Sequence, residues 1–174
     1  MSKKPPPNDA SIPGAVAARV EREYVPIIGV HATKRMLDAA VAVMAGTSTA
    51  YMQTIRTPDG RPYMRRHFIS ERGSSPQVWV HQILLPDADP WCHDHPWDYR
   101  TIILRGAYDE EHHDGSQDAF AEGDALRREA ETLHRLHLTE PAVTLFMASR
   151  NRRRWGFATP QGWVDGVEYQ AVRA

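Results

Sequence analysis

The sequence predicts an antiparallel β-sandwich or barrel that follows a helical N-terminal extension. After about residue 50, short apolar runs are separated by turn signals rich in proline, glycine and aspartate, which is typical of antiparallel sheets. Before that point, apolar residues recur at spacings of three and four, the period of a helix. A chain of 174 residues has room for one substantial core, so we expect one main domain.

The N-terminal part is predicted in two pieces. Residues 1–13 are polar and proline-rich, and we expect them to form a disordered tail. Residues 14–48 are expected to form a helical extension, with helices over Ala15–Tyr24 and Lys34–Met44 and a stop at Gly46. This extension would cap the main body or form an oligomer contact.

Residues 49–174 are predicted to form the β-domain. The turn Thr57–Pro62 separates the first two expected strands, and another break occurs at Pro86–Pro90. The region His112–Thr132 is acidic and lacks a period, so we expect a long loop there, with a brief helix at Ala125–Glu131. The expected strands are Tyr51–Arg56, Tyr63–Ser70, Val78–Leu85, Arg100–Tyr108, Leu133–Leu138, Val143–Ala148 and Trp163–Gln170.

The composition excludes several classes of protein. Lys and Arg total 21 and Asp and Glu total 22, so the charge gives no indication of a nucleic-acid partner. No apolar stretch approaches the roughly 18 residues of a membrane span, and Met1–Pro7 lacks the apolar core of a secretory signal. The single cysteine, Cys92, excludes an internal disulfide. We therefore expect a cytoplasmic protein with neither a nucleic-acid nor a membrane partner.

His93 and His95 form the most informative pair in the sequence. Residues two positions apart point to the same side of an extended strand, so the two imidazoles could share one metal ion. Alternation in Leu133–Leu138 places His134 on the more apolar face, where a histidine needs a partner, and we interpret it as the third ligand. The alternatives are a surface pair, a core histidine bonded to a backbone carbonyl, and His137 as third ligand.

These residues resemble the motifs of the cupin superfamily. His93 and His95 match the His-x-His pair of the first motif, and Gly106 matches the glycine that closes its strand. His134 is placed like the histidine of the second motif. The resemblance implies an all-β fold, an antiparallel double-stranded β-helix (the jelly-roll or cupin barrel) with the helical extension before it.

A closer resemblance is to a group of short bacterial and phage cupin-like proteins. Their hallmarks occur here as His93–Trp97, Trp155–Phe157 and Pro160–Trp163, and the likeness covers residues 60–168. Cupins include dioxygenases, isomerases, decarboxylases and plain binding proteins, so the resemblance is specific for the fold and not for the reaction.

The glutamate of the first cupin motif is absent, because Tyr99 and Arg100 stand in its place. A site of three histidines is similar to the iron centres of thiol dioxygenases among the cupins. The resemblance thus implies one divalent transition metal, Fe(II) first and Zn, Mn or Ni as alternatives, and an oxygenase acting on a small, amino-acid-like molecule. The alternatives are a metal-dependent isomerase, epimerase or lyase, and a non-enzymatic ligand-binding or virion-associated protein. A homodimer is implied by the resemblance alone.

Arginines near the histidines indicate an acidic substrate. An arginine that points into a β-structure is costly unless it meets an anion. We therefore expect Arg65, Arg66 or Arg100 to bind a substrate carboxylate, with an outward salt bridge as the alternative. The basic run Arg150–Arg154 is predicted to be a solvated loop.

Two aromatic residues are expected at the site. Tyr99 has the parity of His95 if the strand is regular, so we expect it to hydrogen-bond a metal-bound ligand as a catalytic residue. Trp97 is expected to line the substrate pocket and exclude water, and an ordinary core position is the alternative.

Overall fold

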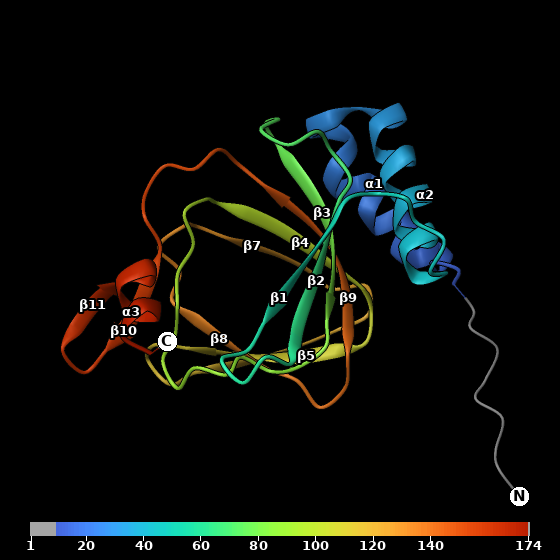
Figure 1. Cartoon of the computed structure of the whole chain (residues 1–174). Helices are drawn as coiled ribbons and strands as arrows, with labels where there is room; N and C mark the ends of the chain where they lie inside the picture. Colours follow the sequence, from blue (N-terminus) through green and yellow to red (C-terminus); the bar gives the residue numbers. More distant parts are fainter. Residues whose placement is uncertain (1–9, 174) are drawn as a thin grey trace, which may run out of the picture. The chain divides into compact units, whose positions relative to one another are not determined.

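The computed structural model describes residues 10–173 and divides into two compact units at residue 50, so residues 1–9 of the expected tail lie outside the described part. The first unit contains helices α1 (Gly14–Ile28) and α2 (Val30–Met44), which contact each other (Figure 1). Gly29 joins them at φ +82°, a left-handed conformation that favours glycine. Both expected helices are confirmed and are longer than predicted. None of the helices described in the structure has the length and apolar character needed to cross a membrane.

The second unit consists of antiparallel sheets. The larger sheet has the strand order β1-β2-β3-β9-β4-β7, the smaller has β6-β5-β8, and β10 and β11 form a separate hairpin. The elements are β1 (Met52–Arg56), β2 (Pro62–Phe68), β3 (Gln77–Ile83), β4 (Tyr99–Arg105), β5 (Ala107–His112), β6 (Gln117–Ala121), β7 (Ala125–Arg128), β8 (His134–His137), β9 (Ala142–Ala148), β10 (Gly156–Thr159), β11 (Gly162–Asp165) and α3 (Gly166–Arg173). The predicted antiparallel β-structure is confirmed.

Gly106 divides the strand that was expected over Arg100–Tyr108. At this residue φ is +79°, and a Cβ atom would lie 2.5 Å from the carbonyl oxygen of Pro141. Only glycine fits such a close approach at positive φ, so the chain turns here from β4 in the larger sheet to β5 in the smaller sheet. The glycine expected to close the strand therefore does so.

Two other expectations are wrong. The region expected as a loop contains β6 and β7, and the helix expected at Ala125–Glu131 is replaced by β7, whose backbone pairs with β4. The strand expected over Trp163–Gln170 ends at Asp165 and gives way to α3. The Asp165 carboxylate accepts hydrogen bonds from the backbone N–H groups of Val167 and Glu168, which favours the start of a helix at this point.

The interior of the β-unit has an aliphatic cluster and an aromatic cluster. The aliphatic cluster is built around Met64, Ile83, Ile103, Tyr108, Leu136 and Ala142. The aromatic cluster contains Trp79, Tyr99, Phe146 and Ala148, with Phe68 and Trp97 packed against it. Trp97 and Tyr99 also contact the ring of His95, so the aromatic cluster forms one wall of the histidine site.

Candidate metal centre

The structure brings His93, His95 and His134 together. One ring nitrogen of each lies within 4.8 Å of the others, and Nε2 of His95 is 2.8 Å from Nε2 of His134. The three ring centroids are 5.0–5.2 Å apart. Three nitrogen donors at this spacing fit a single transition metal ion, whose bonds to imidazole nitrogen are about 2 Å long.

Backbone hydrogen bonds join the two segments that carry these histidines. The N–H of His93 donates to the carbonyl of His134 at 2.8 Å, and the N–H of His134 donates back at 2.9 Å. The His93–His95 segment does not belong to a regular strand, although an extended strand was expected. Its backbone pairing with His134 nevertheless keeps the segment locally extended. The side-chain alternation that the sequence predicted therefore survives in an irregular segment.

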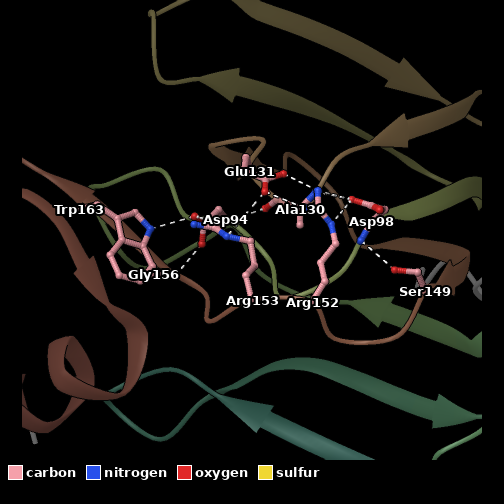
Figure 2. Close-up of polar contacts among 9 residues, drawn as sticks. All are labelled: Asp94, Asp98, Ala130, Glu131, Ser149, Arg152, Arg153, Gly156 and Trp163. Atoms are coloured by element: carbon pink, nitrogen blue, oxygen red, sulfur yellow. Dashed lines mark hydrogen bonds and ion pairs between the residues drawn. The ribbon is translucent and has the colours of Figure 1, made fainter.

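Asp94 points away from the two histidines and is 2 % exposed. Its carboxylate accepts hydrogen bonds from the backbone N–H of Gly156 at 2.6 Å and from Nε1 of Trp163 at 2.8 Å, and it forms an ion pair with Arg153 (Figure 2). The backbone N–H of Asp94 donates to the carbonyl of Gly156 at 3.0 Å. Asp94 thus attaches the histidine segment to the β10-β11 hairpin.

Asp98 forms the second half of the polar network in Figure 2. Its carboxylate accepts hydrogen bonds from the backbone N–H of Ala130 and from the guanidinium group of Arg152, which also pairs with Glu131. Residues 150–155 form a loop in which Arg152 is 43% exposed, as predicted, and the ion pairs of Arg152 and Arg153 also attach this loop to its neighbours.

Two buried carboxylates contact the outer sides of the histidine rings. Nδ1 of His134 donates to Oε1 of Glu110 at 2.6 Å, and Nδ1 of His93 lies 3.7 Å from Oδ2 of Asp87. Burial raises the pKa of Glu110, but hydrogen bonds from His134 and Arg128 outweigh it and bring the pKa to about 2. A carboxylate that is hydrogen-bonded to Nδ1, as Glu110 is to His134, orients an imidazole ligand and leaves Nε2 for the metal. Sequence reasoning missed both residues.

His93 and His95 are in the protonation state that a metal requires. Burial lowers the pKa of His93 and lowers the pKa of His95 well below its usual value, and the neighbouring histidines add to the effect at His95. Both rings are therefore neutral near pH 7, and neutral imidazole is the form that binds transition metals.

A pocket of about 1310 Å³ opens beside the histidines. His93, His95 and Trp97 line it together with Tyr63, Arg66 and Asp87, and residues of α3 line another part of its wall. The indole of Trp97 stacks on His95 with 6.1 Å between ring centroids.

Arg66 is the expected arginine that faces this pocket. Its Nε donates to Nε2 of His81 at 3.2 Å, and its guanidinium carbon lies 4.6 Å from the ring centroid of Trp79. Among the described residues no acidic side chain forms an ion pair with it, and burial lowers its pKa to about 10. The result is a half-buried, charged guanidinium that pairs with no anion in the described part of the chain.

Arg65 and Arg100, the two alternatives to Arg66, are not among the residues that line this pocket. Arg65 is exposed, because neighbouring residues of a strand point to opposite faces and Arg66 occupies the inner one. Arg100 follows the inward-facing Tyr99 on β4 and is directed outward for the same reason.

Tyr99 lies in the wall next to the histidines. Its ring is 5.1 Å from that of His95 in an edge-to-face arrangement and stacks on Phe146 at 4.6 Å. Burial, followed by the charge of Glu110, raises the pKa of Tyr99 well above its usual value, so its hydroxyl stays protonated.

Comparison with known proteins identifies the fold. No family model matches the sequence, and no curated protein matches it. The DMSP lyase DddQ from Ruegeria pomeroyi is 18% identical with a TM-score of 0.54, over 85% of this chain and 78% of that chain. The polyketide cyclase RemF from Streptomyces resistomycificus is 15% identical with a TM-score of 0.54, over 71% and 88%. Rru_A2000 from Rhodospirillum rubrum, a cupin-2 domain, is 14% identical with a TM-score of 0.53, over 70% and 82%.

These likenesses establish the architecture of the chain. It has the jelly-roll fold of the cupins, preceded by two helices, as the resemblance in sequence implied. At these identities the likeness extends to the fold alone, so the reaction has to be argued from the site.

Proposed function

We propose that this protein is a metal-dependent enzyme that acts on a small molecule carrying a carboxylate. One observation carries the proposal: three imidazoles converge beside a pocket that is also lined by Arg66, a half-buried arginine that pairs with no acidic side chain among the described residues. The imidazoles provide a site for a cation, and the arginine provides a site for an anion in the wall of the same pocket.

The metal would be held by His93, His95 and His134. Three nitrogen ligands suit Fe(II), the expected metal, and also Zn, Mn or Ni. When bound, such a metal would supply either Lewis acidity or a redox partner for dioxygen. The carboxylate of Glu110 would hold the His134 ring in place from the outer side, and the carboxylate of Asp87 lies near the outer side of the His93 ring.

Arg66 would bind the substrate carboxylate. His81 accepts only the Nε proton, which leaves the terminal nitrogens for a two-pronged contact with a carboxylate. The indole nitrogens of Trp79 and Trp97 are buried and have no hydrogen-bond partner in the described part of the chain. The surroundings of Arg66 thus hold more donors than acceptors, which favours an anionic group.

The reaction class that we propose first is the oxygenase, because the described cluster contains three histidines and no carboxylate ligand, which leaves positions for both substrate and oxygen. Tyr99 would donate a hydrogen bond from its protonated hydroxyl to the reacting ligand. The second class is an isomerase, epimerase or lyase. It is favoured by Tyr63, which lines the pocket and donates a hydrogen bond from its hydroxyl to the Asp87 carboxylate. This pair could carry a proton to or from the substrate.

Metal analysis tests the proposal. Protein expressed in iron-supplemented medium should contain a stoichiometric metal, and His93→Ala, His95→Ala and His134→Ala should each lose it. His137→Ala is the matched control and should keep it, because His137 pairs with Glu111 outside the cluster. A wild-type protein that cannot take up Fe, Zn, Mn or Ni would instead support the non-enzymatic alternative. Oxygen consumption during turnover separates the two reaction classes.

Small carboxylates such as acetate, succinate and benzoate test the anion site through their effect on thermal unfolding. Arg66→Gln should weaken their binding by about 10- to 100-fold, as expected for a lost hydrogen bond to a charged group. Arg65→Gln is the control, since Arg65 is exposed on the opposite face. Equal binding by Arg66→Gln and wild type would remove the carboxylate from the proposal.

The domain division, the homodimer and the cytoplasmic location stay predictions.

A further inference from the structure

Glu110 and Arg128 lie behind His134 in a position that the proposed reaction does not use. Oε1 of Glu110 accepts the hydrogen bond from Nδ1 of His134 at 2.6 Å, and Oε2 is 2.5 Å from Nη2 of Arg128. Nε of Arg128 also donates to Oε1 at 3.2 Å. Glu110 is 1 % exposed, so its carboxylate has exchanged water for these two partners.

The three residues come from strands of both sheets. Glu110 and His134 lie on β5 and β8 of the smaller sheet, and Arg128 lies on β7 at the edge of the larger one. Each side chain points into the space between the sheets, since Arg128 pairs with the buried Tyr99 and Glu110 pairs with the buried Leu136. The chain of contacts therefore runs from one sheet, through the carboxylate, to a histidine on the other.

The contact decides which nitrogen of His134 carries the proton. A carboxylate that is bonded to a guanidinium group can only accept, so Nδ1 of His134 must be the donor. The lone pair then lies on Nε2, the atom that is 2.8 Å from Nε2 of His95. The other tautomer would place a proton on Nε2, where the metal has to bind. It would also direct the lone pair of Nδ1 at the negatively charged carboxylate of Glu110.

We propose that Glu110 is a positioning residue that fixes the tautomer and ring orientation of His134 for metal binding, with Arg128 holding the carboxylate in place. The chain lacks the glutamate ligand of the first cupin motif. Its carboxylate Glu110 would instead contact a histidine ligand and not the metal itself. The inference rests on the proposed metal site, and it adds a residue that the ligand set alone does not reveal.

The neighbouring residue provides a matched control. Glu111 is on the same strand, and its Oε2 lies 2.5 Å from Nε2 of His137, which repeats the pairing of a carboxylate with a histidine. This pair is partly exposed and does not belong to the cluster of His93, His95 and His134. Glu111→Gln therefore removes the same kind of contact from the same strand without touching the metal site.

The test measures metal affinity and tautomer separately. Zn(II) and Co(II) are titrated into apo-protein against a chelator of known affinity, and ¹⁵N NMR of histidine-labelled apo-protein identifies the protonated nitrogen of His134. Glu110→Gln should weaken metal binding by about 10- to 100-fold, the usual effect of losing such a contact. Glu111→Gln should bind as wild type does. In the wild type, His134 should be protonated on Nδ1.

Four outcomes are informative. Weaker metal binding by Glu110→Gln but not by Glu111→Gln supports the positioning role, whereas equal affinity of Glu110→Gln and wild type overturns it. If Glu110→Gln does not fold, the wild-type NMR spectrum decides, since a proton on Nε2 of His134 overturns the inference and a proton on Nδ1 supports it. Failure of the wild type to bind any metal would refute the proposed function, and the spectrum would still test the contact with Glu110.

Discussion

Asp94→Asn is the substitution whose effect on stability follows most directly from the structure. The carboxylate is almost completely buried and receives three donors, namely the backbone N–H of Gly156, the indole N–H of Trp163 and the guanidinium group of Arg153. Asparagine has nearly the same shape but only one acceptor oxygen, and its amide would present protons to groups that are themselves donors. The substitution thus changes the hydrogen bonding and leaves the packing almost unchanged.

The expected loss is large for a single substitution. Removing one partner of a buried ion pair typically costs about 3–5 kcal/mol, because the remaining charge and donors stay buried without compensation. For a domain of this size, about 3 °C per kcal/mol converts this loss into a fall of roughly 9–15 °C in Tm. The hairpin β10-β11 should also detach from the histidine segment, so metal retention should weaken.

Urea unfolding of the apo-protein, followed by tryptophan fluorescence, measures the loss without interference from metal. Asp98→Asn is the matched control, because this carboxylate belongs to the same network but is 46% exposed, and its pairing with Arg152 is screened by water. Its effect should be a small fraction of the effect at Asp94. A free energy of unfolding for Asp94→Asn within about 1 kcal/mol of wild type, comparable to an exposed pair, would refute this account of the network.

Three further substitutions test other parts of the structure. Gly106→Ala should cost about 2 kcal/mol or more in urea unfolding, because its Cβ would meet the Pro141 carbonyl at positive φ, whereas Gly115→Ala, with open space around it, should cost less. Below pH 6.5 the free energy of unfolding of the apo-protein should fall less steeply with falling pH in His81→Gln than in wild type, by about 1.4 kcal/mol per pH unit. The reason is that burial lowers the pKa of His81 in the folded protein, so that only the unfolded chain takes up this proton. The same slope in both proteins would contradict this. Tyr99→Phe should keep its metal and lose about tenfold or more in turnover, and full activity would exclude its hydroxyl from the reaction.

Strands were predictable from the sequence wherever they contribute to the core. Val143–Ala148 is a nearly continuous apolar run, and the corresponding strand β9 is almost completely buried between β3 and β4. By contrast, four of the five side chains of β6 are exposed, so the strand shows no apolar alternation and was taken for a loop. Its position depends on backbone pairing with β5, which leaves no mark in the pattern of side chains.

The candidate ligands could be found from local spacing, but the groups around them could not. His93 and His95 are two residues apart, and that spacing is sufficient to place them on one side of an extended segment. The choice of Arg66 over Arg65 needed the strand register, in which Arg66 lies opposite the buried His81. Glu110 acquires its role only because β5, β7 and β8 meet, and no local pattern encodes that meeting.

The register of Asp94 explains why three separated sequence motifs occur together. The middle residue of His-Asp-His cannot reach the metal, because the alternation that directs both histidines to one side directs Asp94 to the other. There its carboxylate binds Gly156 of the Trp-Gly-Phe motif and Trp163 of the Pro-Gln-Gly-Trp motif (Figure 2). A change at Asp94 or Trp163 would remove one partner of this network, and a side chain at Gly156 would collide with the Val164 carbonyl oxygen and the Trp163 indole, so the motifs form one structural unit. That unit holds the histidine segment at the rim of the pocket, where the proposed chemistry requires it to be rigid.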